Sequence, residues 1–279
     1  MATLRVTAEE EFSKNPELKQ EDLDELREFM KSKAHLPVIS DEQLIMFVHS
    51  CYYKVSATKD CILQYYRLRA ECSDVFTGRD LELPACQDII QVMKYVELPV
   101  PDNNGYHVIF HRFCITEPSR YMFPVALKVF FMLIDACLIQ HGTSPGVVFL
   151  LDAAGLRLGH ILRLSLSLVR KGMSYLQEGM PVRLKAIHVV NSVYAVDQIM
   201  VLLKPFMNRE LYNMIHFHKG NNETLYSYMP RKCLPQDYGG ELPPIAQLHE
   251  NSIADMKGLD KYFKEEEKQR CPPLSLDHF

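Results

Sequence analysis

Three histidines and one aspartate are the residues whose spacing could support chemistry. His216 and His218 are two positions apart in a strand-like segment, so both side chains share one face and could bind one metal ion. A third ligand is not evident, and packed or rim histidines are the favoured interpretation. His188 has no Ser or Cys to activate and is expected to be a core histidine. Asp152 ends an apolar run and is expected to cap the following turn.

Motifs of common enzyme classes are missing from the chain. The sequence contains no GxxxxGK[ST] phosphate loop, no GxGxxG turn and no HExxH pair. The eight cysteines form no CxxC pair and no spacing typical of metal ligands, so we expect reduced thiols. The sequence therefore favours a protein without catalytic residues, bound metal or cofactor.

Composition and charge indicate a globular, cytosolic protein. The 279 residues are 47% hydrophobic, and a formal net charge of -4 argues against a broad nucleic-acid surface. The amino terminus, MATLRVTAEEEF, has no apolar signal core, which predicts the cytoplasm. The apolar stretch from 122 to 139 carries Lys128, Asp135 and an internal proline, so we expect a buried core helix rather than a membrane span.

The chain up to about residue 95 predicts a small all-helical domain. Asn15 is expected to cap a helix that begins at Pro16. Ser40 and Gln43 form a capping-box pattern that opens a second helix, and KDCILQYYRLRAEC predicts a third.

From about residue 105, strands alternate with helices. The expected strands are 106–113, 146–152, 182–190 and 212–218, and the expected helices are 124–141, 158–179 and 191–207. This alternation predicts an α/β fold with a mainly parallel sheet and flanking helices. The tail predicts a last helix and a loose end, which divides the chain into 1–95, 96–250 and 251–279.

The helix expected at 191–207 has an unusually wide apolar arc. One buried face is formed by Val196, Ile199, Leu203 and Met207, and the flanks carry Met200, Val201, Leu202 and Phe206. Periodicity alone leaves two explanations open: a helix buried between two core layers, or a helix whose outer face meets another apolar partner.

Several stretches, in order along the chain, resemble signatures of the CRAL-TRIO lipid-binding family. These are GVVFLLDAAG, LKAIHVVN, LLKPFMN followed by IHFHKG, and LPQDYGGEL. The similarity is to the branch of α-tocopherol transfer protein and retinaldehyde-binding protein, and it covers roughly residues 15 to 250. The resemblance implies a non-catalytic carrier with a hydrophobic ligand pocket between sheet and helices. It also implies that 191–207 is a mobile lid whose outer residues meet a membrane.

The predicted pocket wall follows from this resemblance and from strand alternation. The strands contribute Val147, Phe149, Leu151, Leu184, Ile187 and Val189; the helices contribute Phe130, Phe131, Ile134, Tyr175, Leu176, Met180, Val196, Ile199, Leu203 and Met207. The stretch KVFFMLIDACL lacks the hydroxyl side chains that the family's tocopherol carrier has there. We therefore favour a retinoid, carotenoid or other isoprenoid over tocopherol itself, with Tyr175 as the polar contact.

A basic rim is predicted beside the pocket. Arg183 and Lys185 are two apart on a strand and can converge on one phosphate, and Lys204 and Arg209 are expected nearby. The resemblance implies further basic residues at the positions of Cys51, Tyr212 and Met214, where this chain has none. Only modest attraction to anionic lipid or phosphoinositide is therefore expected.

The main hypothesis is a cytosolic lipid-binding and transfer protein for one isoprenoid-like molecule, with transient membrane contact. The alternative is a phosphoinositide-responsive adaptor that acts through a protein partner. A monomer is favoured, although the sequence leaves the oligomeric state open.

Overall fold

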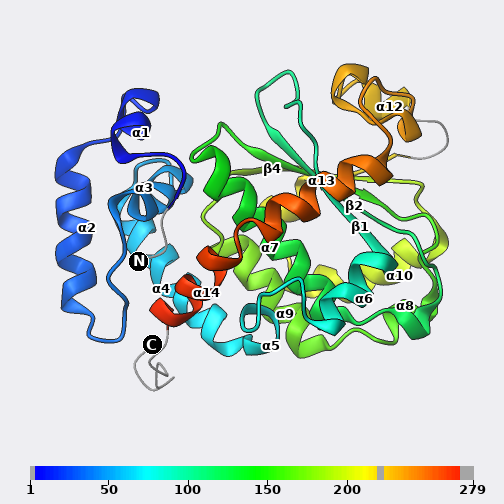
Figure 1. Ribbon diagram of the computed structural model, residues 1–279, viewed down its shortest axis with the longest axis horizontal. Helices are drawn as coiled ribbons and strands as arrows, with labels where there is room; N and C mark the ends of the chain where they lie inside the picture. Colours follow the sequence, from blue (N-terminus) through cyan, green and yellow to red (C-terminus); the bar gives the residue numbers. More distant parts are fainter. Residues whose placement is uncertain (1–3, 219–222, 271–279) are drawn as a thin grey trace.

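The computed structural model describes residues 4–218 and 223–270. Over these residues, the chain begins with six helices, of which α1 to α4 lie at the left of Figure 1. They are α1 (Ala8–Lys14), α2 (Gln20–Ser32), α3 (Asp41–Ser50), α4 (Val55–Glu71), α5 (Ser73–Phe76) and α6 (Pro84–Val92). Helix α2 buries one apolar stripe of Leu23, Leu26 and Met30, whereas α3 buries every residue from Leu44 to His49. These helices confirm the predicted helical lead-in.

The helix starts test two capping predictions. The Ser40 side chain accepts a hydrogen bond from Gln43 N, and the Gln43 side chain accepts one from Ser40 N, so the predicted capping box is confirmed. The prediction for Asn15 was wrong, because this residue ends α1 and α2 begins only at Gln20. Asn15 Nδ2 instead donates to Glu11 Oε2, four residues earlier, and to Thr143 Oγ1, both at 2.9 Å; the distant partner Thr143 is not visible in the local pattern.

The centre of the molecule is a five-stranded mixed sheet in the order β1-β2-β3-β4-β5. The strands are β1 (Met93–Glu97), β2 (His107–Phe113), β3 (Val147–Asp152), β4 (Leu184–Val190) and β5 (Ile215–Phe217). Strands β2 to β5 are parallel, whereas β1 is antiparallel to β2, so the mainly parallel sheet is confirmed. The edge strand β1 was missed, because its residues lie where the sequence suggested the end of the helical domain.

The two faces of the sheet carry separate cores. One face turns Phe149, Ile187 and Val189 toward α7 (Phe123–His141), α9 (Leu166–Ser174) and α10 (Tyr194–Leu203). The other face turns Val148, Leu150 and Val190 toward the segment from α12 (Glu223–Tyr226) to α13 (Ile245–Lys257). The remaining short elements are η1 (Pro118–Arg120), α8 (Leu158–Ile161), η2 (Tyr175–Gly179), η3 (Lys204–Phe206), α11 (Arg209–Asn213), η4 (Arg231–Cys233) and η5 (Gln236–Tyr238).

Helix α7 is the core helix expected from its composition. Among the described residues it alone is long and apolar enough to cross a membrane. Val129, Met132 and Leu133 are almost fully buried inside the protein, and the helix packs on β1, α5 and α6. These contacts agree with the interpretation of a core helix.

The predicted helix at 158–179 is broken in the structure. Helix α8 ends at Ile161, α9 starts at Leu166, and the last turn, Tyr175–Gly179, is a π-helix. The side chain of Ser165 accepts a hydrogen bond from Leu168 N and thereby caps α9, so this serine begins a new helix.

The carboxyl-terminal helices tie the two halves of the chain together. Helix α13 crosses the boundary expected at residues 250 and 251, and its His249 and Ser252 accept hydrogen bonds from β1. Helix α14 (Asp260–Arg270) reaches the amino-terminal helices, as Figure 1 shows in red. Its buried Glu266 meets the guanidinium groups of Arg69 and Arg79, which both also bind Asp135 of α7.

Candidate functional site

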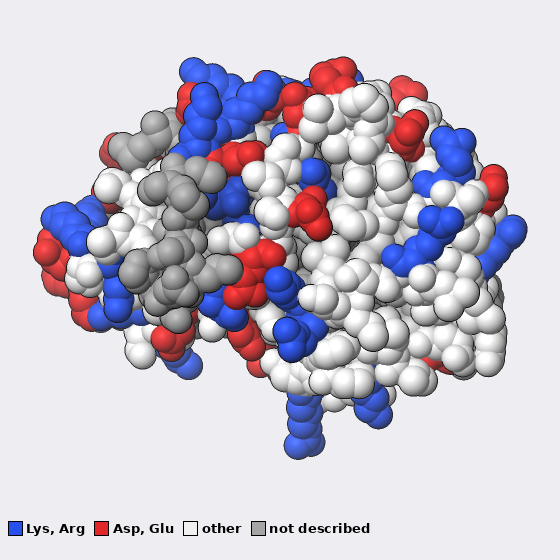
Figure 2. Space-filling view, turned by 90° about the horizontal axis from the view of Figure 1, so that it is seen from below, with Lys and Arg blue, Asp and Glu red and all other residues white. Residues whose placement is uncertain are grey.

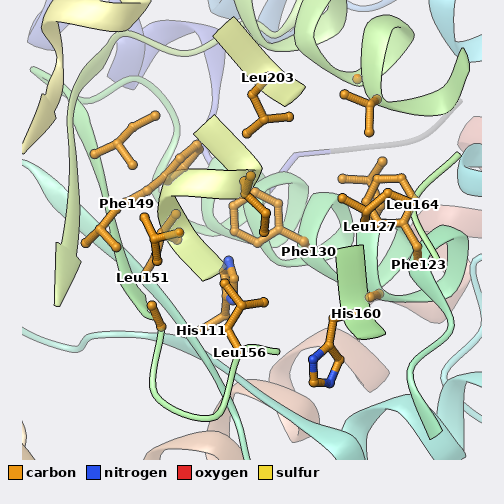
Figure 3. A pocket seen from close by; sticks show the side chains of 18 of the residues that line it. His111, Phe123, Leu127, Phe130, Phe149, Leu151, Leu156, His160, Leu164 and Leu203 are labelled. Atoms are coloured by element: carbon orange, nitrogen blue, oxygen red, sulfur yellow. The ribbon is translucent and has the colours of Figure 1, made fainter. Parts of the chain in front are cut away.

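A cavity of about 320 Å³ lies between the sheet and the helices α7, α9 and α10. This volume is at the lower end of the roughly 300 to 1,000 Å³ typical of ligand pockets. Large apolar side chains from several elements point into it in Figure 3, among them Phe149 and Leu151 of β3, Phe130 of α7 and Leu203 of α10. A space of this size among such side chains suits an apolar molecule.

The structure places eleven of the sixteen predicted pocket residues on the cavity wall. These are Phe130, Phe131, Phe149, Leu151, Leu176, Ile187, Val189, Val196, Ile199, Leu203 and Met207. Strand alternation and helix periodicity are local properties, and they identified the faces of β3, β4 and α10 that turn to the cavity. A ligand-binding role for these residues stays a prediction.

The other five predicted residues lie away from the cavity wall, for reasons of geometry. Val147 and Leu184 pair at the amino-terminal ends of β3 and β4, ahead of a register irregularity, whereas the lining residues of these strands lie further along. Ile134 is buried further along α7 than Phe123, Ala126, Leu127, Phe130 and Phe131, which line the cavity. Met180 follows the π turn and is buried in the core.

Tyr175, the fifth of these residues, does not serve as the polar contact that the sequence suggested. Its hydroxyl accepts hydrogen bonds from Arg69 Nη2 at 2.7 Å and from Arg69 Nε at 3.0 Å. Its ring packs behind Phe131, with the centroids 5.0 Å apart. Tyr175 therefore connects Arg69 of α4 to Phe131, which lines the cavity, without lining the cavity itself.

Helix α10 has an inner and an outer apolar face, which explains its wide apolar arc. Val196, Ile199, Met200 and Leu203 line the cavity. On the outside, Val201 is 72% exposed and Tyr194 is 68% exposed, and Leu162, which follows α8, is 87% exposed. Helices α8 and α10 are in contact, so these outer side chains belong to one surface region. In Figure 2, the lower part of the right half is largely white, whereas charged residues appear above it and at the edge.

The cavity wall contains polar groups that the sequence reasoning did not single out. These are His111 of β2, His160 of α8 and Tyr121, and they line the cavity together with Asp152, which the sequence did suggest. Burial lowers the pKa of His111 to about 4, so its ring is uncharged at neutral pH. The signal was available in HVIFHRF, because alternation places His111 on the same strand face as Ile109 and Phe113.

The predicted basic rim is partly occupied by aromatic residues that follow α3. The Arg183 guanidinium lies 4.2 Å from the Tyr52 ring centroid, and Arg183 Nε donates to His49 O at 2.8 Å. Lys185 Nζ donates to the Tyr52 hydroxyl at 2.9 Å. The pair therefore converges on Tyr52. Lys204 Nζ lies 5.2 Å from the Tyr212 ring centroid, and Arg209 is exposed at the start of α11.

The residues first considered for chemistry have structural partners. His188 Nδ1 lies 2.9 Å from His218 Nε2, and His216 stacks on His188, so these histidines pack with one another. Asp152 Oδ1 accepts a hydrogen bond from Ala154 N at 2.8 Å, which confirms the predicted turn cap.

The segment GTSPG, residues 142–146, matches the GxSxG pattern of a nucleophile elbow, but it precedes β3 instead of following a strand.

The comparisons with known proteins agree with this architecture. The family described as "CRAL/TRIO domain" matches residues 92–240, and the one described as "Pinta-like, UBA domain" matches residues 15–86. The human protein "Alpha-tocopherol transfer protein-like" is 26% identical over 261 residues, which are 92% of this chain and 75% of that protein. Human "Clavesin-2" is 21% identical over 237 residues, or 84% of this chain and 72% of that protein.

A solved structure shares the fold. The crystal structure of Sfh5 superposes with a TM-score of 0.59 at 13% sequence identity, covering 85% of this chain and 97% of Sfh5. The CRAL/TRIO match begins at the boundary between α6 and β1 and spans more than half of the chain, including all five strands and the cavity-lining helices. The chain therefore belongs to the CRAL/TRIO domain family of lipid-binding and transfer proteins.

Proposed function

We propose that this protein is a cytoplasmic carrier that encloses one isoprenoid-like lipid and exchanges it at membranes. The observation that carries the proposal is the apolar cavity beneath α10, a helix that has apolar side chains on both its inner and its outer face. A ligand that buries roughly 500 Å² of apolar surface gains about 12 kcal/mol at ~25 cal/mol per Å². This gain exceeds an association cost of at least ~4 kcal/mol, so tight binding is expected.

Exchange at a membrane follows from the energetics of opening. Moving α10 into water would expose Val196, Ile199 and Leu203 at about 1.5 to 3 kcal/mol each. A bilayer would cover these side chains again, together with the already exposed Leu162, Tyr194 and Val201. We therefore expect contact with a bilayer to lower the barrier to ligand release.

Substitution of the outer apolar surface should slow transfer while leaving binding intact. Val201→Asp combined with Leu162→Asp places two charges where the protein would enter the bilayer, so we expect transfer between vesicles to slow by at least tenfold. Equilibrium ligand affinity should change less than twofold, because neither residue lines the cavity. Stopped-flow transfer of a fluorescent lipid between donor and acceptor vesicles measures the rate.

The matched control is Val38→Asp with Leu83→Asp, which makes the same replacements at exposed apolar positions of the helical region. This control should transfer at the rate of the unmodified protein. Equal transfer rates for the test and control variants would contradict the membrane-contact surface.

The ligand itself can be sought directly. Protein purified without detergent is extracted with organic solvent and analysed by mass spectrometry, with Val38→Asp/Leu83→Asp protein and empty-vector material processed in parallel. We expect an isoprenoid-like lipid in near-stoichiometric amount. If no lipid accompanies the protein and none binds on addition, the carrier proposal is wrong.

Phosphoinositide recognition should be weak, because Arg183 and Lys185 are already engaged with Tyr52. We expect anionic lipid to raise vesicle binding modestly, equally for phosphatidylserine and phosphatidylinositol bisphosphates of matched charge, and less so at physiological salt. Vesicle sedimentation at two salt concentrations tests this. An isomer-specific preference that survives physiological salt and is lost in Arg183→Ala/Lys185→Ala would instead support the adaptor hypothesis.

A further inference from the structure

One histidine in the cavity wall has no protein partner for its ring nitrogens. Within residues 4–218 and 223–270, His111 Nδ1 is fully buried without a hydrogen-bond partner, and Nε2, which is not fully buried, makes no hydrogen bond either. The ring is held by aromatic contacts, edge-to-face with Phe130 at 5.2 Å and beside Tyr95 at 6.3 Å between centroids. Figure 3 shows His111 among Phe130, Leu151 and Leu156, with its nitrogen atoms inside the group of lining side chains. The ring thus faces the cavity in a fixed orientation.

An unpaired imidazole is an unfavourable residue for this position. A neutral histidine has one N–H donor and one acceptor nitrogen, and each costs free energy when buried without a partner. The neighbours on the same face of β2 are apolar and carry no such cost: Phe113 lines the cavity, and Ile109 is buried in the core. A polar ring at position 111 therefore suits a cavity whose occupant forms a hydrogen bond there.

The charges of the cavity wall restrict which polar group a bound ligand can carry. Among the described lining residues none is Lys or Arg, and Asp152 is the one acidic residue. The Asp152 carboxylate is already satisfied by Ala154 N, Asn191 Nδ2 and the Tyr238 hydroxyl. Burial holds the pKa of His111 well below neutrality, so the ring offers no positive charge. A carboxylate placed in this cavity would have no counter-ion and would lie near another anion.

Two other side chains of the cavity wall, His160 and Tyr121, could also offer a hydrogen bond to a ligand. His160 Nδ1 accepts a hydrogen bond from Arg157 N at 3.0 Å, so Nε2 carries the proton, but this nitrogen is fully buried and a ligand cannot reach it without a local shift. The ring of Tyr121 packs against His160, with centroids 5.6 Å apart, and the Tyr121→Phe variant below tests its hydroxyl as the alternative contact.

We propose that His111 is the polar anchor of the cavity and that the ligand is a lipophilic molecule whose enclosed end bears a hydroxyl or carbonyl oxygen, not a carboxylate. This inference rests on the proposed carrier function. Nδ1 of His111 is fully buried, so the contact is made by Nε2, which can accept from a hydroxyl or, when it carries the proton, donate to a hydroxyl or carbonyl oxygen. The proposal narrows the ligand class to neutral alcohols, aldehydes and ketones.

The experiment compares probes that share one skeleton and differ only at the end group. Retinol, retinal, retinoic acid and the corresponding hydrocarbon are titrated into the full-length protein and into His111→Leu, and a second series uses hexadecanol, hexadecanal, hexadecanoic acid and hexadecane. We expect His111→Leu to weaken binding of the alcohol and aldehyde by about 5- to 30-fold, the range of one buried hydrogen bond. Hydrocarbon affinity should stay within twofold, and the acid should bind more weakly than the alcohol in the unmodified protein.

The matched control is Phe113→Leu, because Phe113 lines the same cavity two residues along the same strand and has no polar atom in its side chain. The Phe113→Leu variant should change the affinity for the alcohol, the aldehyde, the acid and the hydrocarbon of one series by the same factor. Tyr121→Phe removes only a hydroxyl and should leave the alcohol-to-hydrocarbon ratio unchanged.

The outcomes separate this inference from the carrier function. If neither series binds at all, the carrier function fails and the anchor fails with it. If hydrocarbons and alcohols bind but His111→Leu affects them equally, the carrier function stands and the role of His111 is overturned. Selective loss of alcohol binding in Tyr121→Phe overturns it as well, and preferred binding of the acids overturns the ligand class.

Discussion

The Phe149→Asp variant is expected to lose ligand loading while the protein stays folded. Phe149 is 2% exposed in the floor of the cavity, where its ring packs edge-to-face on Phe130 with centroids 5.1 Å apart. A carboxylate at this position has no cation among the described lining residues, so an apolar ligand would have to bury an unpaired charge. Such burial costs several kcal/mol, and we expect affinity to fall at least 100-fold. Lipid-binding titration and the recovered lipid content measure the loss.

Two comparisons make this prediction specific. Phe149→Asn has nearly the same shape as Phe149→Asp without the charge, so it should retain clearly more binding. Circular dichroism should show that the amino-terminal helices remain formed in both variants, because they pack outside the cavity. A folded Phe149→Asp protein with unchanged affinity would place the binding site elsewhere.

The Glu266→Ala variant is expected to lower the free energy of unfolding by about 3 to 5 kcal/mol, the usual cost of breaking a buried ion network. Glu266 is 3% exposed, and its carboxylate meets Arg69 Nη1 at 3.3 Å and also the guanidinium of Arg79. Removal of this carboxylate leaves Arg69 and Arg79 to share Asp135, and Arg270 loses its ion pair with Glu266. Thermal unfolding should shift downward on the order of 10 °C. The matched control is Glu265→Ala on the same helix, where only a long contact to Lys261 is lost, and its effect should be below about 0.5 kcal/mol.

The same network predicts how stability depends on pH. Burial alone would raise the pKa of Glu266, but the guanidinium groups of Arg79, Arg69 and Arg270 outweigh it and lower the pKa to about 2. Because the folded-state pKa lies below the ordinary value of 4.5, the stabilisation is complete above pH 4.5 and is lost as pH falls toward 2. Urea unfolding across this range should show a steeper acid loss in the unmodified protein than in Glu266→Ala. Parallel pH profiles would show that Glu266 contributes nothing through its charge.

Sequence reasoning succeeded where a local pattern sets the direction of a side chain. Phe149 and Leu151 were assigned to the cavity because strand residues two apart share a face, and Val196, Ile199 and Leu203 because helix residues three and four apart do. It failed where the local pattern is interrupted. Tyr175 begins a π turn, where the regular helical period no longer holds. Leu184 is three residues from Ile187, so strict alternation did not support its assignment to the same face, and it lies ahead of a register irregularity.

The residue sequence by itself determined the alternation of β2 to β5 with the longer helices, the mainly parallel sheet, most of the apolar faces that meet at the cavity and the wide apolar arc of α10. Each of these follows from short-range periodicity. Tertiary structure alone decided which part of each strand lines the cavity and that β1 forms the edge of the sheet. It also decided that the Tyr175 hydroxyl bonds to Arg69 and not to a ligand in the cavity. It also brought Arg69 to Glu266 across 197 positions of the chain and left His111 as an unpaired polar group facing the cavity. Such contacts depend on how distant segments pack, and the periodicity of a single segment carries no information about its distant partner.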